Sequence, residues 1–391
     1  MVTAADLLVD YRMNIKNGMI FTEEGKFSEG SIVVQNGKIS NIIYGESQLP
    51  ESAEDIDATG MYIIPGLVDI HFHGAYGADF CEATEETFKM LEDYELQNGI
   101  TTVFPATMTL DEKELLAILE KASDYIEKSD IDVMEGITLE GPFLALGKKG
   151  AQAAEYIRKP DILSYRKMQE KSRNLISQVA IAPEEDRDME FISCLSGEVT
   201  VSVAHSMADY DTAVMAFSKG ATHVTHLFNG MNPFLHREPG IVGAAFDNSN
   251  VYVELICDGV HVHPSVIRAM YKLFGAERIC MISDSLSATG MADGEYFLGN
   301  QKIIKRKDTA TLADGTLAGS ICNLYDCFVK TVKEMNIPLE EALLSCTRTP
   351  AKSLLKEEKC GVIREGRNAD ILILDRELNR KYIIKKGRII K

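Results

Sequence analysis

Apolar residues follow one pattern near the two ends of the chain and a different pattern between them. At the ends they form short runs separated by Gly and Asn, at 19–21, 31–34, 39–43, 369–374, 382–384 and 387–390. Short apolar runs bounded by turn residues are typical of β-strands. Because the two ends share this pattern, we expect one small β-sandwich domain built from residues 1–62 and 361–391.

Between the ends, strand-like apolar segments alternate with helix-like ones. The strand-like segments cover 62–70, 100–107, 132–139, 177–182, 199–204, 222–227, 251–257 and 279–283. Helical spacing of apolar residues lies between most of them, as at 84–97, 112–128, 209–219 and 264–274. Alternation of this kind implies a parallel sheet. Eight units within residues 63–360 predict an α/β fold, a (β/α)₈ barrel of the TIM type, rather than an open doubly wound sheet.

Composition narrows the class of protein and its partners. The chain has 391 residues, 45% apolar and 26% charged, as in ordinary soluble proteins. It has no signal peptide pattern and no apolar run near the ~20 residues that cross a bilayer, so we expect a cytoplasmic protein. Its eight cysteines form no Cys-X-X-Cys pair and read as reduced thiols.

The charge of the chain bears on its ligands. A net charge of −18 argues against nucleic acid or an anionic membrane as a partner. An anionic substrate would therefore need a local group of basic side chains. For that reason, each Arg or His near a candidate site is informative about whether an anionic substrate binds there.

The segment 62–70 runs into two histidines one residue apart, His71 and His73. In an extended strand alternate side chains point the same way, so the two rings would converge on one face. Neutral imidazole is the commonest protein metal ligand, and the pair indicates a divalent cation. For an isolated pair the better interpretation is one ring bonded in a loop and the other packed, so further ligands must decide.

Further ligand types stand at the ends of other strand-like segments. Glu140 ends the third, His205 and His226 end the fifth and sixth, and Asp284 ends the eighth. Catalytic groups of a (β/α)₈ barrel lie at these strand ends. A single acid there is usually a helix N-cap or solvated. Together with the histidine pair, however, the set predicts a metal site beside a free aspartate.

The remaining histidines and one arginine give weaker signals. His223 lies three residues before a strand-end histidine, so we expect it to face the other way and to pack among helices. We expect no direct role for His236 and His263. His261 follows the seventh strand-like segment and is a candidate for substrate contact. Arg237 could bind phosphate or carboxylate with its guanidinium fork, or form a salt bridge to a nearby acid.

Several motifs occur in a characteristic order along almost the whole chain. They are Pro-Gly-Leu-Val-Asp-Ile-His-Phe-His-Gly at 65–74, Leu-Glu-Gly-Pro-Phe at 139–143, Ala-His-Ser at 204–206, Thr-His-Leu-Phe-Asn-Gly-Met at 225–231, His-Arg-Glu-Pro-Gly at 236–240, Asp-Gly-Val-His at 258–261, Ser-Asp-Ser at 283–285 and Gly-Thr-Leu-Ala-Gly-Ser at 315–320. In this order the chain resembles the N-acetylglucosamine-6-phosphate deacetylases of the amidohydrolase superfamily. The motifs at 139–143 and 236–240 are specific to that family.

The resemblance implies roles for individual residues. Glu140, His205 and His226 match the principal metal ligands of the family, and His71 and His73 match a pair that some members have. Zinc or iron, as one or two ions, is then the expected cofactor.

The resemblance also assigns an acid/base residue and substrate contacts. Asp284 matches the catalytic acid/base. Asn229, with Gly230 in the same loop, Arg237 and His261 match positions that bind the sugar phosphate, partly across a dimer interface. A homodimer acting on a small amino-sugar phosphate is therefore expected.

The chain also departs from the family pattern. The family typically has a histidine in the motif that reads Lys-Lys-Gly-Ala-Gln-Ala here, so Gln152 stands where a ring would polarise the acetamide carbonyl. The expected activity is hydrolysis of N-acetyl-D-glucosamine 6-phosphate to D-glucosamine 6-phosphate and acetate. Because of Gln152, a deacetylase for N-acetylgalactosamine 6-phosphate or another N-acylated compound is the alternative, and a non-catalytic metal- or sugar-phosphate-binding barrel is a remote one.

Overall fold

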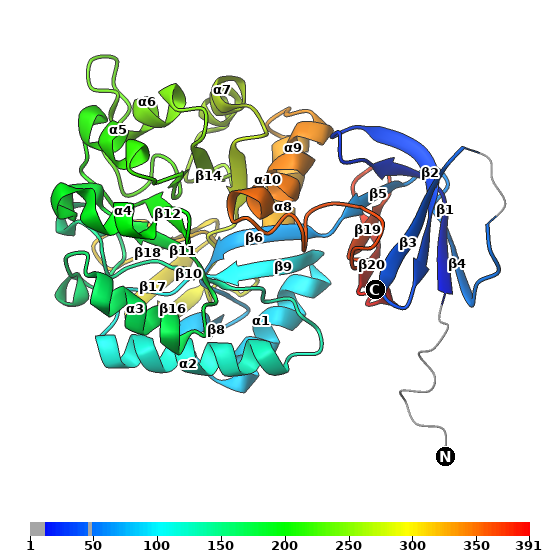
Figure 1. Ribbon diagram of the computed structural model, residues 1–391, viewed down its shortest axis with the longest axis horizontal. Helices are drawn as coiled ribbons and strands as arrows, with labels where there is room; N and C mark the ends of the chain where they lie inside the picture. Colours follow the sequence, from blue (N-terminus) through cyan, green and yellow to red (C-terminus); the bar gives the residue numbers. More distant parts are fainter. Residues whose placement is uncertain (1–11, 46–48) are drawn as a thin grey trace.

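The computed structural model describes residues 12–45 and 49–391, and it brings the two ends of the chain together in one eight-stranded sheet (Figure 1). The strands of this sheet are β1 (Arg12–Phe21), β2 (Phe27–Gln35), β3 (Lys38–Tyr44), β4 (Glu54–Asp57), β5 (Tyr62–Pro65), β19 (Ile371–Leu374), β20 (Arg380–Lys385) and β21 (Arg388–Ile389). They follow the order β21-β20-β19-β5-β1-β2-β3, with β4 paired to β1. The sandwich expected from the sequence is therefore, in its hydrogen bonding, one continuous sheet.

A second set of strands is parallel and follows the chain order. It comprises β6 (Leu67–Phe72), β9 (Ile100–Pro105), β10 (Ile137–Leu139), β11 (Ile176–Ile181), β12 (Thr200–Val203), β13 (His223–Val224), β14 (Tyr252–Ile256) and β15 (Ile279–Ile282). Strands β10 to β15 form one six-stranded sheet, and β6 pairs with β9. Isolated parallel bridges pair Val103 of β9 with Met134, and Ala106, just after β9, with Thr138 of β10. The carboxyl ends of these strands thus lie at one edge, in a mixed α/β fold.

Helices and short strands fill the connections between the parallel strands. The helices are α1 (Glu85–Gln97), α2 (Glu112–Lys128), α3 (Ile162–Lys171), α4 (Glu190–Leu195), α5 (Tyr210–Ser218), α6 (Gly240–Asp247), α7 (Pro264–Phe274), α8 (Leu324–Lys333), α9 (Leu339–Cys346) and α10 (Arg348–Ser353). The additional strands are β7 (Gly74–Ala75), β8 (Ala78–Asp79), β16 (Gly294–Leu298), β17 (Gln301–Arg306) and β18 (Thr309–Thr311). Short 3₁₀ turns occupy Phe80–Glu82, Leu146–Lys148, Ala154–Tyr156, Pro183–Glu185 and Arg187–Met189.

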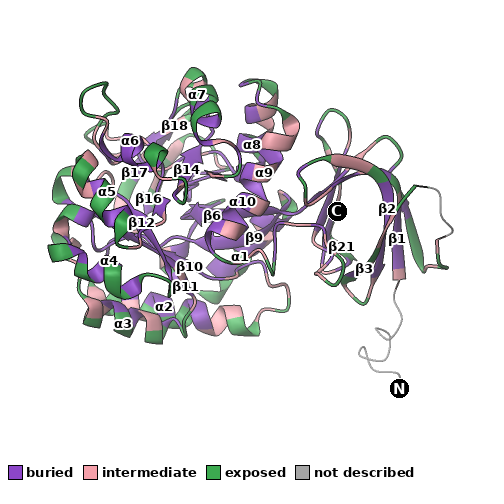
Figure 2. Ribbon diagram, turned by 45° about the horizontal axis from the view of Figure 1, so that its top comes forward, coloured by how far each residue is buried: buried purple, intermediate pink, exposed green. Residues whose placement is uncertain are grey.

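Helix α2 illustrates why these segments form amphipathic helices. Its N-cap Asp111 accepts a hydrogen bond from the backbone N–H of Lys113, which satisfies one of the free donors at the helix start. Leu115, Ile118 and Leu119 are buried on one face, at the spacing of a helix stripe. In Figure 2 the parallel strands are buried, while the helices around them carry exposed residues on their outer faces.

Two features differ from the sequence expectation. The single strand expected over 62–70 is two strands, because β5 pairs with β1 and β19 whereas β6 pairs with β9. The break falls at Gly66, whose N–H donates to Asp370, and a Cβ there would lie 2.0 Å from Oγ1 of Thr101. The three-stranded sheet β16-β17-β18, between β15 and α8, was not expected at all.

Two expectations from composition can be checked against the described residues. All eight cysteines lie within the described ranges and all are free, six of them buried. No helix in the described part of the chain is both long and apolar enough to cross a membrane.

Candidate active site

The predicted site residues occupy unusual backbone positions at the strand ends. His205, His226 and Asp284 all have left-handed backbone angles, with φ of 44°, 29° and 49°. Side chains other than glycine rarely adopt this region, and such strain is most often found at functional sites. Each residue follows a buried parallel strand, so the left-handed angle turns the chain away just where the side chain enters the site.

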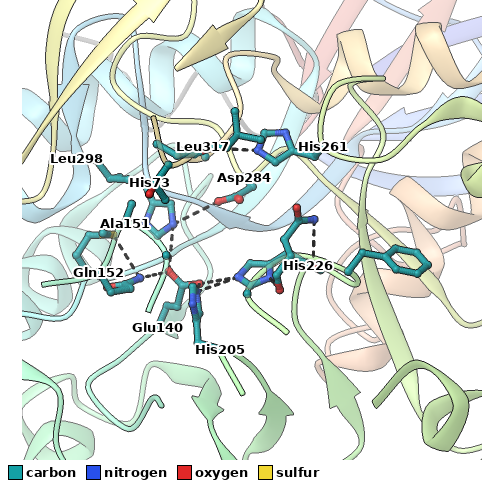
Figure 3. A pocket seen from close by; sticks show the side chains of 18 residues that line it. His73, Glu140, Ala151, Gln152, His205, His226, His261, Asp284, Leu298 and Leu317 are labelled. Carbon is teal, nitrogen blue, oxygen red and sulfur yellow. Dashed lines mark hydrogen bonds and ion pairs between the residues drawn. The ribbon is translucent and has the colours of Figure 1, made fainter. Parts of the chain in front are cut away.

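Four imidazole rings converge on the carboxylate of Glu140. Figure 3 shows three of them, His73, His205 and His226, around this carboxylate. Oε1 of Glu140 lies 3.1 Å from Nε2 of His205, 3.1 Å from Nε2 of His226 and 3.5 Å from Nε2 of His71. Oε2 lies 3.3 Å from Nε2 of His73. Every one of these residues is buried. One carboxylate thus joins two groups of possible ligands, one with the His71–His73 pair and one with the other two histidines.

The other ring nitrogen of each histidine fixes the ring's orientation. Nδ1 of His71 donates to Oε2 of Glu254 at 2.9 Å. The Nδ1 atoms of His73, His205 and His226 donate to the backbone carbonyls of Ala106, Lys148 and Asn229 at 3.3, 2.7 and 3.1 Å, respectively. Because each of these oxygens only accepts, each Nδ1 carries a proton. Burial lowers the pKa of His71, His73 and His226, but the neighbouring carboxylates outweigh it and raise all three, that of His73 to about 9, so without a cation these rings are protonated. A bound cation would take the place of the Nε2 protons, and all four Nε2 atoms face Glu140. This is the arrangement of histidines that bind metal ions.

The remaining contacts also fit a cation. Nε2 of His71 is buried and has no hydrogen-bond partner among the described residues. Nε2 of His205 lies 3.1 Å from Nε2 of His226, so in neutral rings two lone pairs would face each other. A divalent cation would satisfy both features at once, whereas a single proton would satisfy only one contact. The residues present therefore fit a metal ion.

Asp284 lies beside this group, with Oδ1 3.4 Å from Nε2 of His73 and 3.8 Å from Nε2 of His71. Burial raises the pKa of Asp284, but the hydrogen bond from His73 and the charges of His71 and His226 outweigh it and lower the pKa below its usual value. The same competition lowers the pKa of Glu140, because burial is outweighed by the surrounding imidazoles. Both acids are therefore held as carboxylates.

A pocket of about 310 Å³ opens beside Asp284. Gln152, Asn229, Gly230 and His261 all line it, together with Leu298 of β16 and residues 316–319. None of the described residues that line it is Lys or Arg. The volume suits a small ligand, and the polar groups gather on the metal-binding side.

Gln152 is held between the pocket and the carboxylate. Its Oε1 accepts the backbone N–H of Thr109 at 2.7 Å, and its Nε2 donates to Oε2 of Glu140 at 2.6 Å. The amide is therefore fixed in one orientation. Gly230, with φ of 60°, lies against the ring of His205, and a Cβ there would be 2.9 Å from Nδ1. Glycine lets this loop approach the ring closely.

His261 and Arg237 lie in different places. Nδ1 of His261 lies 2.7 Å from Oδ2 of Asp258 and Nε2 lies 3.0 Å from the carbonyl of Ala318. Burial lowers the pKa of His261, but the hydrogen bond and charge of Asp258 raise it above the usual value. Arg237 is exposed, donates to Nε2 of His236 and lines a different cleft. Within one chain the structure does not bring Arg237 to the pocket.

One prediction was wrong and one residue was missed. His223 does not pack among helices: it is fully buried, with Nε2 3.4 Å from Oε1 of Glu254, the same carboxylate that contacts His71. The sequence analysis also passed over Glu254, which is fully buried on β14. A carboxylate in the middle of the apolar run 251–257 was the signal, since burying a charge is costly unless it is paired.

A family model described as the amidohydrolase family matches residues 62–390. The chain belongs to this family, which confirms the resemblance seen in the motifs.

More specific similarities point the same way. The chain is 34% identical over 380 residues to N-acetylglucosamine-6-phosphate deacetylase of Bacillus subtilis (strain 168), covering 96% of each chain. It is 29% identical to N-acetylgalactosamine-6-phosphate deacetylase of Escherichia coli O157:H7, covering 95% of this chain and 97% of that protein. Among solved structures, a mutant N-acetyl-D-glucosamine-6-phosphate deacetylase from Mycobacterium smegmatis, in complex with N-acetyl-D-glucosamine-6-phosphate, has a TM-score of 0.89 at 29% identity, covering 97% of this chain and 99% of that one.

Proposed function

We propose that the chain is a metal-dependent amidohydrolase that converts N-acetyl-D-glucosamine 6-phosphate and water to D-glucosamine 6-phosphate and acetate. The observation that carries this proposal is the convergence of four histidine Nε2 atoms on the carboxylate of Glu140, with Oδ1 of Asp284 3.4 Å from Nε2 of His73. The similarity to the Bacillus subtilis deacetylase over nearly the whole chain supports the choice of substrate.

The metal ligands we propose are Glu140, His205, His226, His71 and His73. They form two groups that share Glu140, which supports one or two ions of zinc or iron. When bound there, a divalent cation supplies Lewis acidity and activates water for attack on the amide carbonyl.

Asp284 is the proposed acid/base. Its lowered pKa keeps Oδ1 unprotonated, so this oxygen can accept a proton from the attacking water and then deliver it to the leaving sugar nitrogen. The nitrogen leaves as a neutral amine only if it receives that proton. Delivery by the same oxygen needs no second acid in the pocket.

Gln152, Asn229, Gly230 and His261 are the proposed substrate contacts within one chain. All four line the pocket, and Nε2 of Gln152 is aimed at the carboxylate that the acetamide would approach. Contacts to the sugar phosphate turn binding energy into orientation of the acetamide. Because Gln152 is neutral, it stabilises a developing oxyanion less than an imidazolium would.

We further propose a homodimer in which Arg237 of a second copy completes the phosphate site. Two observations support it: the pocket lacks Lys and Arg among the described lining residues, and the loop that carries Arg237 exposes Phe234 and Leu235 by 46 and 49%. Exposed apolar side chains gathered in one area are typical of interfaces. Light scattering on the purified chain should give twice the monomer mass, and a monomer would contradict this part of the proposal.

The architecture and location that fit this function are also proposals. We propose a (β/α)₈ barrel over residues 63–360, closed between β15 and β6, and a small domain from 1–62 and 361–391. The hydrogen bond from the N–H of Asp284 to the carbonyl of His71 supports the closure, and the pairing of β19 with β5 supports the small domain. A cytoplasmic location fits a sugar-phosphate substrate.

The test of function is direct. Metal-loaded protein incubated with N-acetyl-D-glucosamine 6-phosphate should release acetate and free amine in equal amounts. No release from any N-acetylhexosamine 6-phosphate would overturn the assignment.

A second candidate is deacetylation of N-acetylgalactosamine 6-phosphate. Gln152 and the similarity to the Escherichia coli O157:H7 protein favour it. Comparing kcat/KM for the two epimers distinguishes the candidates, because the epimer with the higher kcat/KM is the better substrate.

A further inference from the structure

Glu254 is a buried carboxylate that contacts ligands from both halves of the proposed metal site. It lies on β14, is fully buried, and points toward the same interior as His71 and His223. Its Oε2 accepts from Nδ1 of His71 at 2.9 Å and from the backbone N–H of His226 at 3.2 Å. One oxygen atom therefore joins a ligand of the first group to a ligand of the second.

We propose that Glu254 is the positioning residue of the metal site, holding His71 in the ring orientation and tautomer that bind a cation and holding the strained backbone of His226. This inference rests on the proposed function. A carboxylate only accepts, so one proton of His71 stays on Nδ1, and Nε2 is the nitrogen left to face Glu140 and a cation. Such outer partners of metal-binding histidines strongly affect metal affinity.

The backbone contact has its own physical reason. His226 has a φ of 29°, which costs free energy unless surrounding contacts impose it. Oε2 of Glu254 accepts the N–H of His226, and the backbone carbonyl of Glu254 accepts the N–H of the next residue, Leu227, at 2.8 Å. Two bonds from one residue thus hold the turn that aims His226 at Glu140.

The chain offers a matched control on the other oxygen of the same carboxylate. Oε1 of Glu254 accepts from Nε2 of Gln178 at 2.7 Å, and Gln178 is fully buried, with no side-chain hydrogen bond to a proposed metal ligand among the described residues. A Gln178→Met change removes a buried hydrogen bond of similar kind. It leaves the two contacts of Oε2 in place.

The experiment compares Zn²⁺ binding by metal-free wild type, Glu254→Met, Glu254→Gln and Gln178→Met, each titrated against a chromophoric chelator. With Glu254→Met, the donors on His71 and His226 lose their acceptor, and we expect the Kd for Zn²⁺ to rise roughly 10- to 100-fold. With Glu254→Gln, the oxygen of the new side chain can still accept from His71, and the side-chain amide of Gln178 can flip so that its oxygen accepts from the new NH₂ group. We therefore expect a smaller rise in the Kd for Zn²⁺. With Gln178→Met, the Kd should stay close to that of wild type.

The melting temperature of each metal-free variant separates positioning from general stability. A purely structural role of Glu254 would lower the melting temperature and leave the Kd unchanged, which would overturn the inference. If Glu254→Met does not fold, the inference is decided by Glu254→Gln against Gln178→Met, and an equal Kd in these two would overturn it. Wild-type protein that binds no divalent ion would overturn the proposed function as well, whereas metal-binding wild type with unaffected Glu254 variants would overturn only this inference.

Discussion

Two regions of the molecule contain buried carboxylates whose pKa values are shifted in opposite directions. At the strand ends, Glu140 and Asp284 are buried among imidazoles, and their pKa values are lowered. On helix α1, Glu95 is also buried, but neither of its carboxylate oxygens has a hydrogen-bond partner among the described residues. Burial, with the nearby charge of Asp69, raises the pKa of Glu95 well above its usual value.

The difference shows that burial alone does not set the ionisation of an acid. Both regions exclude water, which disfavours a charge, but only around Glu140 and Asp284 do cationic and donor groups reverse the effect of burial on the pKa. Glu92, on the same helix as Glu95, is also buried but accepts hydrogen bonds from Tyr125, Ser129, Val133 and Met134. Partners, rather than depth, therefore distinguish these buried acids.

Removal of the metal tests the first region most severely. A chelator should reduce amine release to background and lower the melting temperature, because four Nε2 atoms and Glu140 lose the ion that satisfies them. Adding back Zn²⁺ or Fe²⁺ should restore both. Full activity after exhaustive chelation, with metal absent by elemental analysis, would contradict the proposed site.

Asp284→Asn removes the acid/base while keeping the shape of the side chain. We expect kcat to fall roughly 10²- to 10⁴-fold, since the amide cannot accept the proton of water or return it to the leaving nitrogen. The measurement is acetate release, with metal content determined on the same samples. A fall of less than tenfold at full metal occupancy would exclude the assigned role.

Gln152→Leu breaks the contact between the pocket and the carboxylate. It removes the amide that donates to Oε2 of Glu140, a hydrogen bond to a charged group worth about 1.5–3 kcal/mol. We expect kcat/KM to fall by roughly 10- to 100-fold. Gln152→His is the informative companion, because a ring at this position should recover part of the loss. Unchanged kcat/KM in Gln152→Leu would show that this amide does not assist.

Glu95→Leu should stabilise the protein, which is the reverse of what removing an acid does at the strand ends. Replacing an unpartnered buried carboxyl by an apolar side chain should raise the free energy of unfolding by about 1–2 kcal/mol. Since the pKa of Glu95 in the folded chain lies above its value in the unfolded chain, this residue costs more stability as pH rises from 5 to 8. The gain on substitution should therefore be larger at pH 8.

The control for this prediction lies on the same helix. Glu92→Leu leaves four donors without their acceptor and should destabilise the protein at both pH values. The measurement is urea unfolding of the metal-loaded chain. Equal destabilisation by both substitutions would remove the contrast between the two acids.

Sequence patterns predicted which candidate residues lie close together where their geometry follows directly from strand periodicity. Parallel strands bring their carboxyl ends to one edge, so residues such as Glu140 and His205 could be expected to meet although they are 65 positions apart. Periodicity did not predict which strand pairs with which. The run 62–70 looked like one strand, but its two halves pair in different sheets, and no local pattern contains that information.

The residue types of the candidate ligands, the acid beside them and their places at strand ends were thus determined by the sequence itself, because they depend on residue type and local spacing. Only the tertiary structure decided that His71 is held by Glu254, 183 positions away, that His223 faces the same carboxylate, and that Arg237 lies outside the pocket of its own chain. These contacts depend on how distant segments pack, and packing selects partners by shape and burial over the whole molecule.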